Sequence, residues 1–125
     1  MEKIFTDKAP KAIGPYSQAI KLGDLVYTSG QIPIDPKSGE IEANDIEGQT
    51  EQVCKNLCAV LEASGASLSS VIKTTCFLQD MSDFAAFNGV YAKYFTSSPA
   101  RSCVVVKSLP KGSLVEIEAV AKIEK

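Results

Sequence analysis

The chain has 125 residues, of which 45% are hydrophobic and 22% are charged, a balance that predicts a single folded domain over residues 1–125. The formal net charge of −2 argues against nucleic acid as the main partner, because proteins that bind a phosphate backbone usually carry a basic patch or stripe. The first residues lack the apolar core of a signal peptide, and no run approaches the roughly 20 apolar residues of a membrane span. We therefore expect a soluble, cytoplasmic protein without membrane contact.

The sequence contains no histidine, which narrows the chemistry that it can support. Ser-His-Asp and Cys-His nucleophilic systems and histidine-ligated metals are excluded. The four cysteines lack CxxC spacing, so we expect reduced thiols and no metal. Glycine-rich phosphate-binding motifs are missing as well, so we expect no nucleotide cofactor. Any reaction must use arginine, carboxylate, tyrosine, hydroxyl, thiol, backbone or water.

The first predicted elements are a β-hairpin and a loop. Residues 17–22 and 25–29 have strand-like composition, and Gly23-Asp24 between them is a two-residue hairpin signal. In residues 30–39, proline and glycine dictate an irregular loop.

A long helix is predicted from about Asp45 to Ser64. Asn44 is the expected N-cap, with Glu47 three positions further on, and Gly65 suits the position after the C-cap. One apolar stripe runs along this helix and consists of Val53, Leu57, Val60 and Leu61.

A strand and a second helix follow. Residues 71–78 alternate β-branched, aromatic and polar types, as a strand does. A helix then begins at Ser82 or Asp83, and Pro99 halts it. We interpret its aromatic and apolar stripe as core rather than as a cofactor site: Phe84, Phe87, Val90, Tyr91, Tyr94 and Phe95.

Two strands close the chain. Residues 102–106 are strongly β-prone, and residues 114–123 alternate cleanly, with Val115 on one face and Glu116 on the other. The order β-β-β-α-β-α-β-β predicts an α+β fold in which two helices cover one face of a mixed sheet.

The other face of that sheet is expected to form an interface. Leu114, Val120 and the side that carries Cys103 and Val105 are too apolar for a fully solvated surface. We therefore expect a homo-oligomer, with sites between subunits.

Arg101 is the first candidate for a functional residue. It is the single arginine beside twelve lysines, and it follows the rigid Pro99-Ala100, so its side chain is well aimed. A guanidinium grips a carboxylate through two parallel hydrogen bonds, and a charge-assisted bond of this kind is worth about 1.5–3 kcal/mol. The alternative is a surface ion pair worth about 0–1 kcal/mol.

Glu116 and Glu118 share one face of the last strand. The ordinary interpretation is that water solvates both. If that face is an oligomer interface, desolvation raises the pKa of one of them, as a general acid–base requires. Arg101 and Glu116 lie toward opposite ends of a hairpin that turns near Pro110, so a site that combines them is expected to use two subunits.

Three further candidates carry weaker signals. Tyr16 lies in a turn-forming segment and is either a packed aromatic or a site residue. Ser29-Gly30-Gln31 ends a strand where glycine permits close approach of a small ligand, the alternative being a simple bend. Cys103 is a candidate nucleophile if the neighbouring arginine lowers the pKa of its thiol, although no base is in sight.

An ordered set of motifs resembles the RidA family, also called YjgF-like, nearly from end to end. Each motif is weak alone, but the set is highly specific. The motifs are Ile13-Gly14-Pro15-Tyr16-Ser17-Gln18, Thr28-Ser29-Gly30-Gln31-Ile32-Pro33, Val71-Ile72-Lys73-Thr74-Thr75, Pro99-Ala100-Arg101-Ser102-Cys103-Val104, Leu109-Pro110-Lys111 and Glu116-Ile117-Glu118-Ala119.

The resemblance implies a chorismate-mutase-like α+β fold, assembled as a homotrimer with clefts between subunits. It implies a cofactor-independent 2-iminobutanoate/2-iminopropanoate deaminase, which hydrolyses enamines or imines released by pyridoxal-phosphate-dependent dehydratases to 2-keto acids and ammonia. Arg101 would clamp the substrate carboxylate, and Glu116 would hold or activate the attacking water. The cleft would also be lined by Tyr16, Ser29, Gly30, Gln31, Asn88 and the backbone at Cys103.

The chain departs from the family pattern in residues 95–99. This segment is shorter than in many members and lacks the aromatic residue often found just before Pro99. Where it borders the cleft, we expect the substrate range to differ.

Two rival functions follow from the same residues. A regulatory module would recognise a 2-keto acid through Arg101 without turnover, although Glu116 and Tyr16 argue for catalysis. Proteins that resemble this family have also been described as endoribonucleases or translation inhibitors. The acidic pI near 5.1 and the missing basic stripe weigh against that function.

Overall fold

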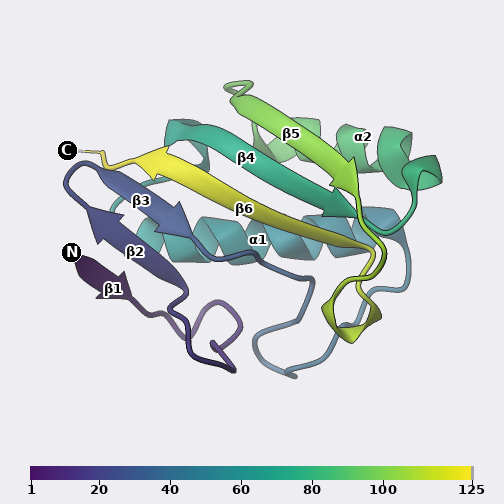
Figure 1. The fold of residues 1–125 in the computed structure, drawn as a ribbon, viewed down its shortest axis with the longest axis horizontal. Helices are drawn as coiled ribbons and strands as arrows, with labels where there is room; N and C mark the ends of the chain where they lie inside the picture. The colour runs from purple at the N-terminus through teal and green to yellow at the C-terminus, as the bar shows by residue number, and fades with distance from the viewer. Residues whose placement is uncertain (125) are drawn as a thin grey trace.

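The computed structural model describes residues 1–124 as one mixed six-stranded sheet with two α-helices on one of its faces (Figure 1). The strands lie in the order β1-β2-β3-β6-β4-β5; β4 and β5 run parallel, and the other neighbours are antiparallel. The elements are β1 Glu2–Ile4, β2 Ala19–Leu22, β3 Leu25–Thr28, α1 Ile46–Ala63, β4 Val71–Leu78, α2 Phe84–Tyr94, β5 Ala100–Val105 and β6 Val115–Lys122. The α+β class, the mixed sheet and the order of elements are confirmed.

The predicted hairpin forms at the predicted turn. Leu22 pairs with Leu25, so Gly23 and Asp24 make the turn, and Gly23 has a φ of +60° that suits glycine. The strand predicted over residues 71–78 has the same bounds as β4.

Other boundaries differ slightly from the expected ones. Ser82 and Asp83 belong to a short 3₁₀ turn, Met81–Asp83, that leads directly into α2. β1 pairs with β2 through Glu2 and Lys21, and its three residues are too few to show an alternating pattern. Within residues 1–124, neither α-helix is long and apolar enough to cross a membrane.

Helix α1 is capped by Asp45, not by Asn44. The Asp45 Oδ1 atom accepts a hydrogen bond from the Gly48 backbone N–H at 2.8 Å, and the extended backbone of Asp45 is that of an N-cap. Asn44 therefore lies one position outside. Both residue types cap well, so the sequence does not choose between neighbours. Gly65 follows the C-cap Ser64 with φ +86°, as predicted.

The core lies between the helices and the sheet. Phe87, Tyr91 and Phe95 of the predicted aromatic stripe are buried. The ring centroids of Phe87 and Tyr91 lie 5.5 Å apart, and those of Tyr91 and Phe95 lie 4.4 Å apart. Opposite them, Val115 and Ile117 of β6 are fully buried, as their alternation predicted. The stripe of α2 is therefore core, as interpreted.

Three residues expected on the outer face of the sheet point the other way. Cys103 and Val105 pair with the buried Cys76 and Leu78, on the helix side, and Leu114 packs against the core. The expectation is wrong for Cys103 and Val105 because β5 begins at Ala100 and carries apolar residues on both faces, so its composition does not fix which side is inward. It is wrong for Leu114 because β6 begins only at Val115, so the alternation of that strand does not extend to Leu114. The outer face carries Tyr27, Lys73, Thr75, Phe77, Ser102, Val104, Glu116, Glu118 and Val120.

Replacing Asp45 with alanine is expected to lower the free energy of unfolding by about 1 kcal/mol, because the Gly48 N–H loses its cap. Urea denaturation followed by circular dichroism measures this loss. The matched control is Asn44→Ala, which is expected to change stability by less than about 0.5 kcal/mol. Equal losses in the two variants would contradict the capping role of Asp45.

Candidate active site

Arg101 is held on the helix side of the sheet, over the aromatic rings of α2. Its guanidinium carbon lies 4.9 Å from the ring centroid of Tyr91, 5.6 Å from that of Phe84 and 5.9 Å from that of Phe87. Each cation–π contact at a partly exposed site contributes about 0.5–1 kcal/mol. The Nη1 atom donates a hydrogen bond to Asn88 Oδ1 at 2.7 Å. These contacts fix the direction of the guanidinium.

A shallow pocket of about 410 Å³ opens beside this guanidinium. A guanidinium has five N–H donors, and Asn88 accepts from one of them, so donors remain for an anion in the pocket. The segment 95–99, which departs from the family pattern, borders this pocket. The lining residues are Asn88, Tyr91, Ala92, Phe95, Thr96, Ser98, Pro99 and Arg101.

Glu116 lies on the outer face of the sheet, directly against Gly30. A β-carbon placed on Gly30 would overlap Glu116 Oε2 and would lie 2.8 Å from its Cδ atom, so the carboxylate needs a glycine here. Partial burial raises the pKa of Glu116, and the negative charge of Glu118 raises it further. A carboxyl group with a raised pKa can take and return a proton closer to neutral pH.

Arg101 and Glu116 do not meet within one chain. In the sheet, Arg101 pairs with the buried Thr74, and Thr74 pairs with Ala119. The side chains of all three residues therefore project from the face that the helices cover. Glu116 is three residues along β6 and two strands across, which puts the two Cα atoms about 14 Å apart. The two side chains also project from opposite faces of the sheet.

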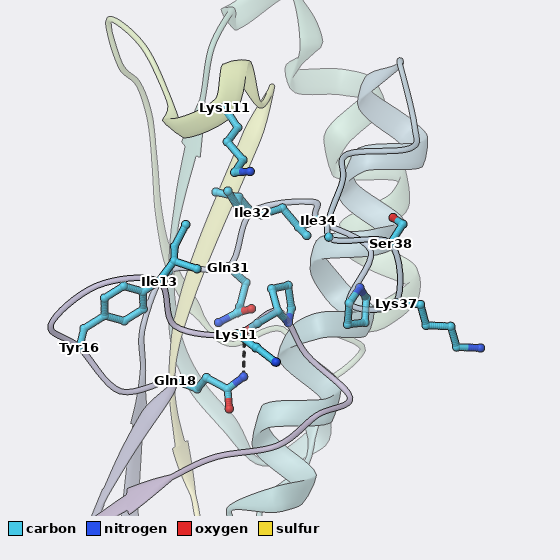
Figure 2. A pocket seen from close by; sticks show the side chains of 14 residues that line it. Lys11, Ile13, Tyr16, Gln18, Gln31, Ile32, Ile34, Lys37, Ser38 and Lys111 are labelled. Atoms are coloured by element: carbon cyan, nitrogen blue, oxygen red, sulfur yellow. Dashed lines mark hydrogen bonds between the residues drawn. The ribbon is translucent and has the colours of Figure 1, made fainter.

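Four other predicted residues, Tyr16, Ser29, Gly30 and Gln31, gather near Glu116 rather than near Arg101. Tyr16, Gly30 and Gln31 line a second pocket, of about 340 Å³, shown in Figure 2. Tyr16 is exposed, and the Ser29 hydroxyl donates to the Ser17 carbonyl at 2.6 Å, tying the end of β3 to the approach of β2. The predicted set thus falls into two groups, Arg101 with Asn88, and the residues around Gly30.

Two features of the structure argue against a nucleophilic role for Cys103. Burial raises the pKa of its thiol, and the charge of Arg101 only partly opposes that rise. Its side chain packs against the core. All four cysteines are free thiols, and burial raises the pKa of Cys76 to about 12. Among residues 1–124, no cluster of three or more potential metal-ligating side chains is present.

The aromatic support of Arg101 escapes the sequence analysis. Helical spacing marks Phe84, Phe87 and Tyr91 as core, and they are core, but the same rings also carry the guanidinium. These contacts between the guanidinium and the rings join β5 to α2. A lone arginine after a helix with an aromatic stripe is the one local signal that could have indicated it.

Comparison with known proteins identifies the family. The family model described as Endoribonuclease L-PSP matches residues 6–123. The chain belongs to this RidA-like family. A RutC family protein of Pyrococcus horikoshii is 60% identical over 121 residues, which cover 96% of each chain. The Arabidopsis thaliana protein named Reactive Intermediate Deaminase A, chloroplastic, is 50% identical over 123 residues, which cover 98% of this chain and 66% of that protein.

Solved structures share the whole fold with this RidA-like protein. A Thermotoga maritima protein matches with a TM-score of 0.96 at 51% identity, covering 100% of this chain and 99% of that chain. The structure of Escherichia coli TdcF with bound serine matches with a TM-score of 0.94 at 44% identity, covering 99% of this chain and 100% of that one. The family identified by its motifs is thereby confirmed.

Glu116→Gln is expected to stabilise the protein at neutral pH. Because the pKa of Glu116 is raised in the folded state, the wild type loses stability as pH rises from the ordinary pKa of 4.5 through the raised one. The amide that replaces this carboxyl group does not titrate, so the variant does not lose stability in this way. Urea denaturation across this range is expected to show a gap that opens as pH rises. Glu118→Gln removes only the smaller cause and is expected to give a smaller gain. A gap of equal size at acidic pH would contradict the assignment.

Proposed function

We propose that this RidA-like protein hydrolyses 2-imino and 2-enamino acids, such as 2-iminobutanoate and 2-iminopropanoate, to 2-keto acids and ammonia without a cofactor. The observation that carries the proposal is the fixed guanidinium of Arg101 beside an open pocket. A guanidinium held in this way suits the carboxylate that every such substrate carries. The name of the Arabidopsis relative, a reactive intermediate deaminase, supports the same reaction.

Glu116 is the proposed general base and acid. The water oxygen attacks the carbon of the protonated imine, the C=N π electrons move to nitrogen, and the Glu116 carboxylate takes a proton from that water to leave a neutral carbinolamine. The protonated Glu116 then returns the proton to the nitrogen, ammonia leaves as the C=O bond forms, and the hydroxyl proton departs on the ammonia. Each step needs a carboxyl group that exchanges protons readily, and the raised pKa of Glu116 suits this task.

The proposed site combines two copies of the chain. Arg101 and Glu116 project from opposite faces of the sheet, so one small substrate cannot contact both within one copy. A neighbouring copy that packs on the outer face would bring its Arg101 toward Glu116. The exposed Tyr27 and Val104 on that face favour burial of this kind. We propose a homotrimer, as the family resemblance implies, with Tyr16, Ser29, Gly30, Asn88 and the Cys103 backbone lining each cleft. The resemblance also implies Gln31, but its pairing with the buried Ile117 directs its side chain to the helix side of the sheet, so we leave it out of the cleft.

Small-molecule binding without turnover is the second candidate. It is favoured by the relative TdcF, whose structure holds serine. A binding module needs Arg101 but not a carboxyl group of raised pKa, so product formation distinguishes the two. The RNA cleavage named by the family model is opposed by the net charge of −2.

A coupled assay tests the reaction. Purified protein added to a threonine dehydratase is expected to accelerate release of 2-oxobutanoate. Arg101→Lys keeps the positive charge but loses the bidentate hydrogen bonding to the substrate carboxylate, so kcat/KM is expected to fall about 10-fold to 100-fold. Lys107→Ala, an exposed cation after β5, is the control and is expected to leave kcat/KM unchanged. No acceleration, with saturable binding of 2-oxobutanoate, would favour the binding module.

Mixing two inactive variants tests the shared site. Arg101→Ala chains keep Glu116, and Glu116→Ala chains keep Arg101, so mixed oligomers are expected to contain some intact sites and to regain activity. Unfolding the two variants together and refolding them produces the mixture, and each variant refolded alone is the control. Activity that stays at the level of the single variants would show that both residues act within one chain or that one of them is not needed.

A further inference from the structure

We propose that the pocket between β6 and α1 binds a small carboxylic acid with an apolar body, on the helix side of the sheet and beside the proposed reaction centre. The pocket has a volume of about 340 Å³, within the range of about 300–1,000 Å³ that is typical of small-molecule sites. Two separate loops, residues 10–18 and 30–39, and the turn before β6 enclose it (Figure 2). Much of its wall is apolar: Pro10, Ile13, Ile32, Ile34 and Pro36.

Gln31 provides an unused polar group inside this pocket. It is 5% exposed, and its backbone exchanges two hydrogen bonds with Ile117, at 2.8 and 3.1 Å. Among residues 1–124, no hydrogen-bond partner is found for its side-chain amide, which points into the pocket in Figure 2. Every fully enclosed side-chain nitrogen or oxygen in the described chain is hydrogen-bonded, so this amide keeps its small exposure toward the pocket. A nearly buried amide without a protein partner is a group that a ligand can satisfy.

The neighbouring Gln18 shows what a structural amide looks like in the same place. Its Oε1 accepts from the Thr6 backbone N–H at 2.7 Å, and its Nε2 donates to the Pro10 carbonyl at 2.8 Å. Gln18 is 2% exposed and holds the first loop together. Gln31 has no such task, and this difference indicates a binding role for its side chain.

The charges around the pocket select an anion. Three of the described lining residues are lysines and none is acidic, although the whole chain has a net charge of −2. In Figure 2, Lys111 reaches from the turn before β6 toward Ile32, Lys11 lies on the opposite side, and Lys37 extends away from the pocket. A carboxylate near Lys111, an apolar body between the isoleucines and a hydrogen bond to Gln31 would satisfy all three features.

The pocket shares Tyr16 and Gly30 with the proposed reaction cleft, but neither Arg101 nor Glu116 lines it. Gln31 is paired with Ile117, so its side chain lies on the buried side of β6, whereas Glu116 lies on the outer face. Arg101 belongs to β5, at the far edge of the sheet from the loop that carries Gln31. An acid bound in this pocket therefore does not need the guanidinium of Arg101, and the proposal stands apart from the deaminase activity.

A titration followed by nuclear magnetic resonance tests the site. The signals of the Gln31 side-chain NH₂ group are expected to shift saturably when 4-methylpentanoate is added to the nitrogen-15-labelled protein. The neutral 4-methylpentanamide lacks the charge and acetate lacks the apolar body, so both are expected to bind more weakly. Absence of any saturable shift of Gln31 at millimolar 4-methylpentanoate would overturn the proposal.

Three variants locate the acid. Lys111→Gln is expected to weaken 4-methylpentanoate binding about twofold to fivefold, the effect of losing one exposed ion pair. Lys37→Gln is the matched control at the same rim and is expected to leave the affinity unchanged, because that side chain points away. Arg101→Ala is expected to leave the Gln31 response intact. If Arg101→Ala abolishes the response, or if the two lysine variants behave alike, the proposal is overturned, whatever the deaminase assay shows.

Discussion

The two-residue period of β6 determines where the functional groups of this protein lie. Ile117 and its inward neighbours are buried under the helices, and Gln31, which pairs with Ile117, therefore projects on the same side. Glu116 precedes Ile117 by one residue, so it projects from the outer face against Gly30. A shift of one residue would drive the carboxylate into the core, where an unpaired charge costs several kcal/mol. Packing of the core thus fixes the position of the candidate catalytic carboxylate.

Elements that depend on local chemistry could be predicted from the sequence. The hairpin turn at Gly23-Asp24 and the helix end at Gly65 need glycine's backbone freedom, and both occur where predicted. The alternation of β6 is equally local, because each inward position needs an apolar side chain. The face of β5 could not be predicted. Cys103 and Val104 are both apolar and point to opposite sides, so only the pairing with β4 decides which is inward.

The sequence indicated Arg101 but not its surroundings. One arginine among lysines is a compositional signal, whereas its contacts with Asn88 and with the rings of α2 arise from the crossover that brings α2 and β5 together. The pocket at Gln31 is non-local in the same way, since two loops about twenty residues apart form it. Residue type identifies chemistry, but the register of the strands decides which groups share a face.

Gly30 is the physical link between the two proposed sites. Its missing side chain leaves room for the Glu116 carboxylate on one side, and its backbone lines the Gln31 pocket on the other. The loop that follows is anchored, because Asn56 Nδ2 donates to the carbonyls of Ile32 and Ile34 at 3.1 and 3.0 Å. A ligand in the pocket would therefore influence Glu116 more through its charge than through movement of the loop. A bound carboxylate would add a second negative charge near Glu116, in the same sense as Glu118, and would raise the pKa of the candidate base further.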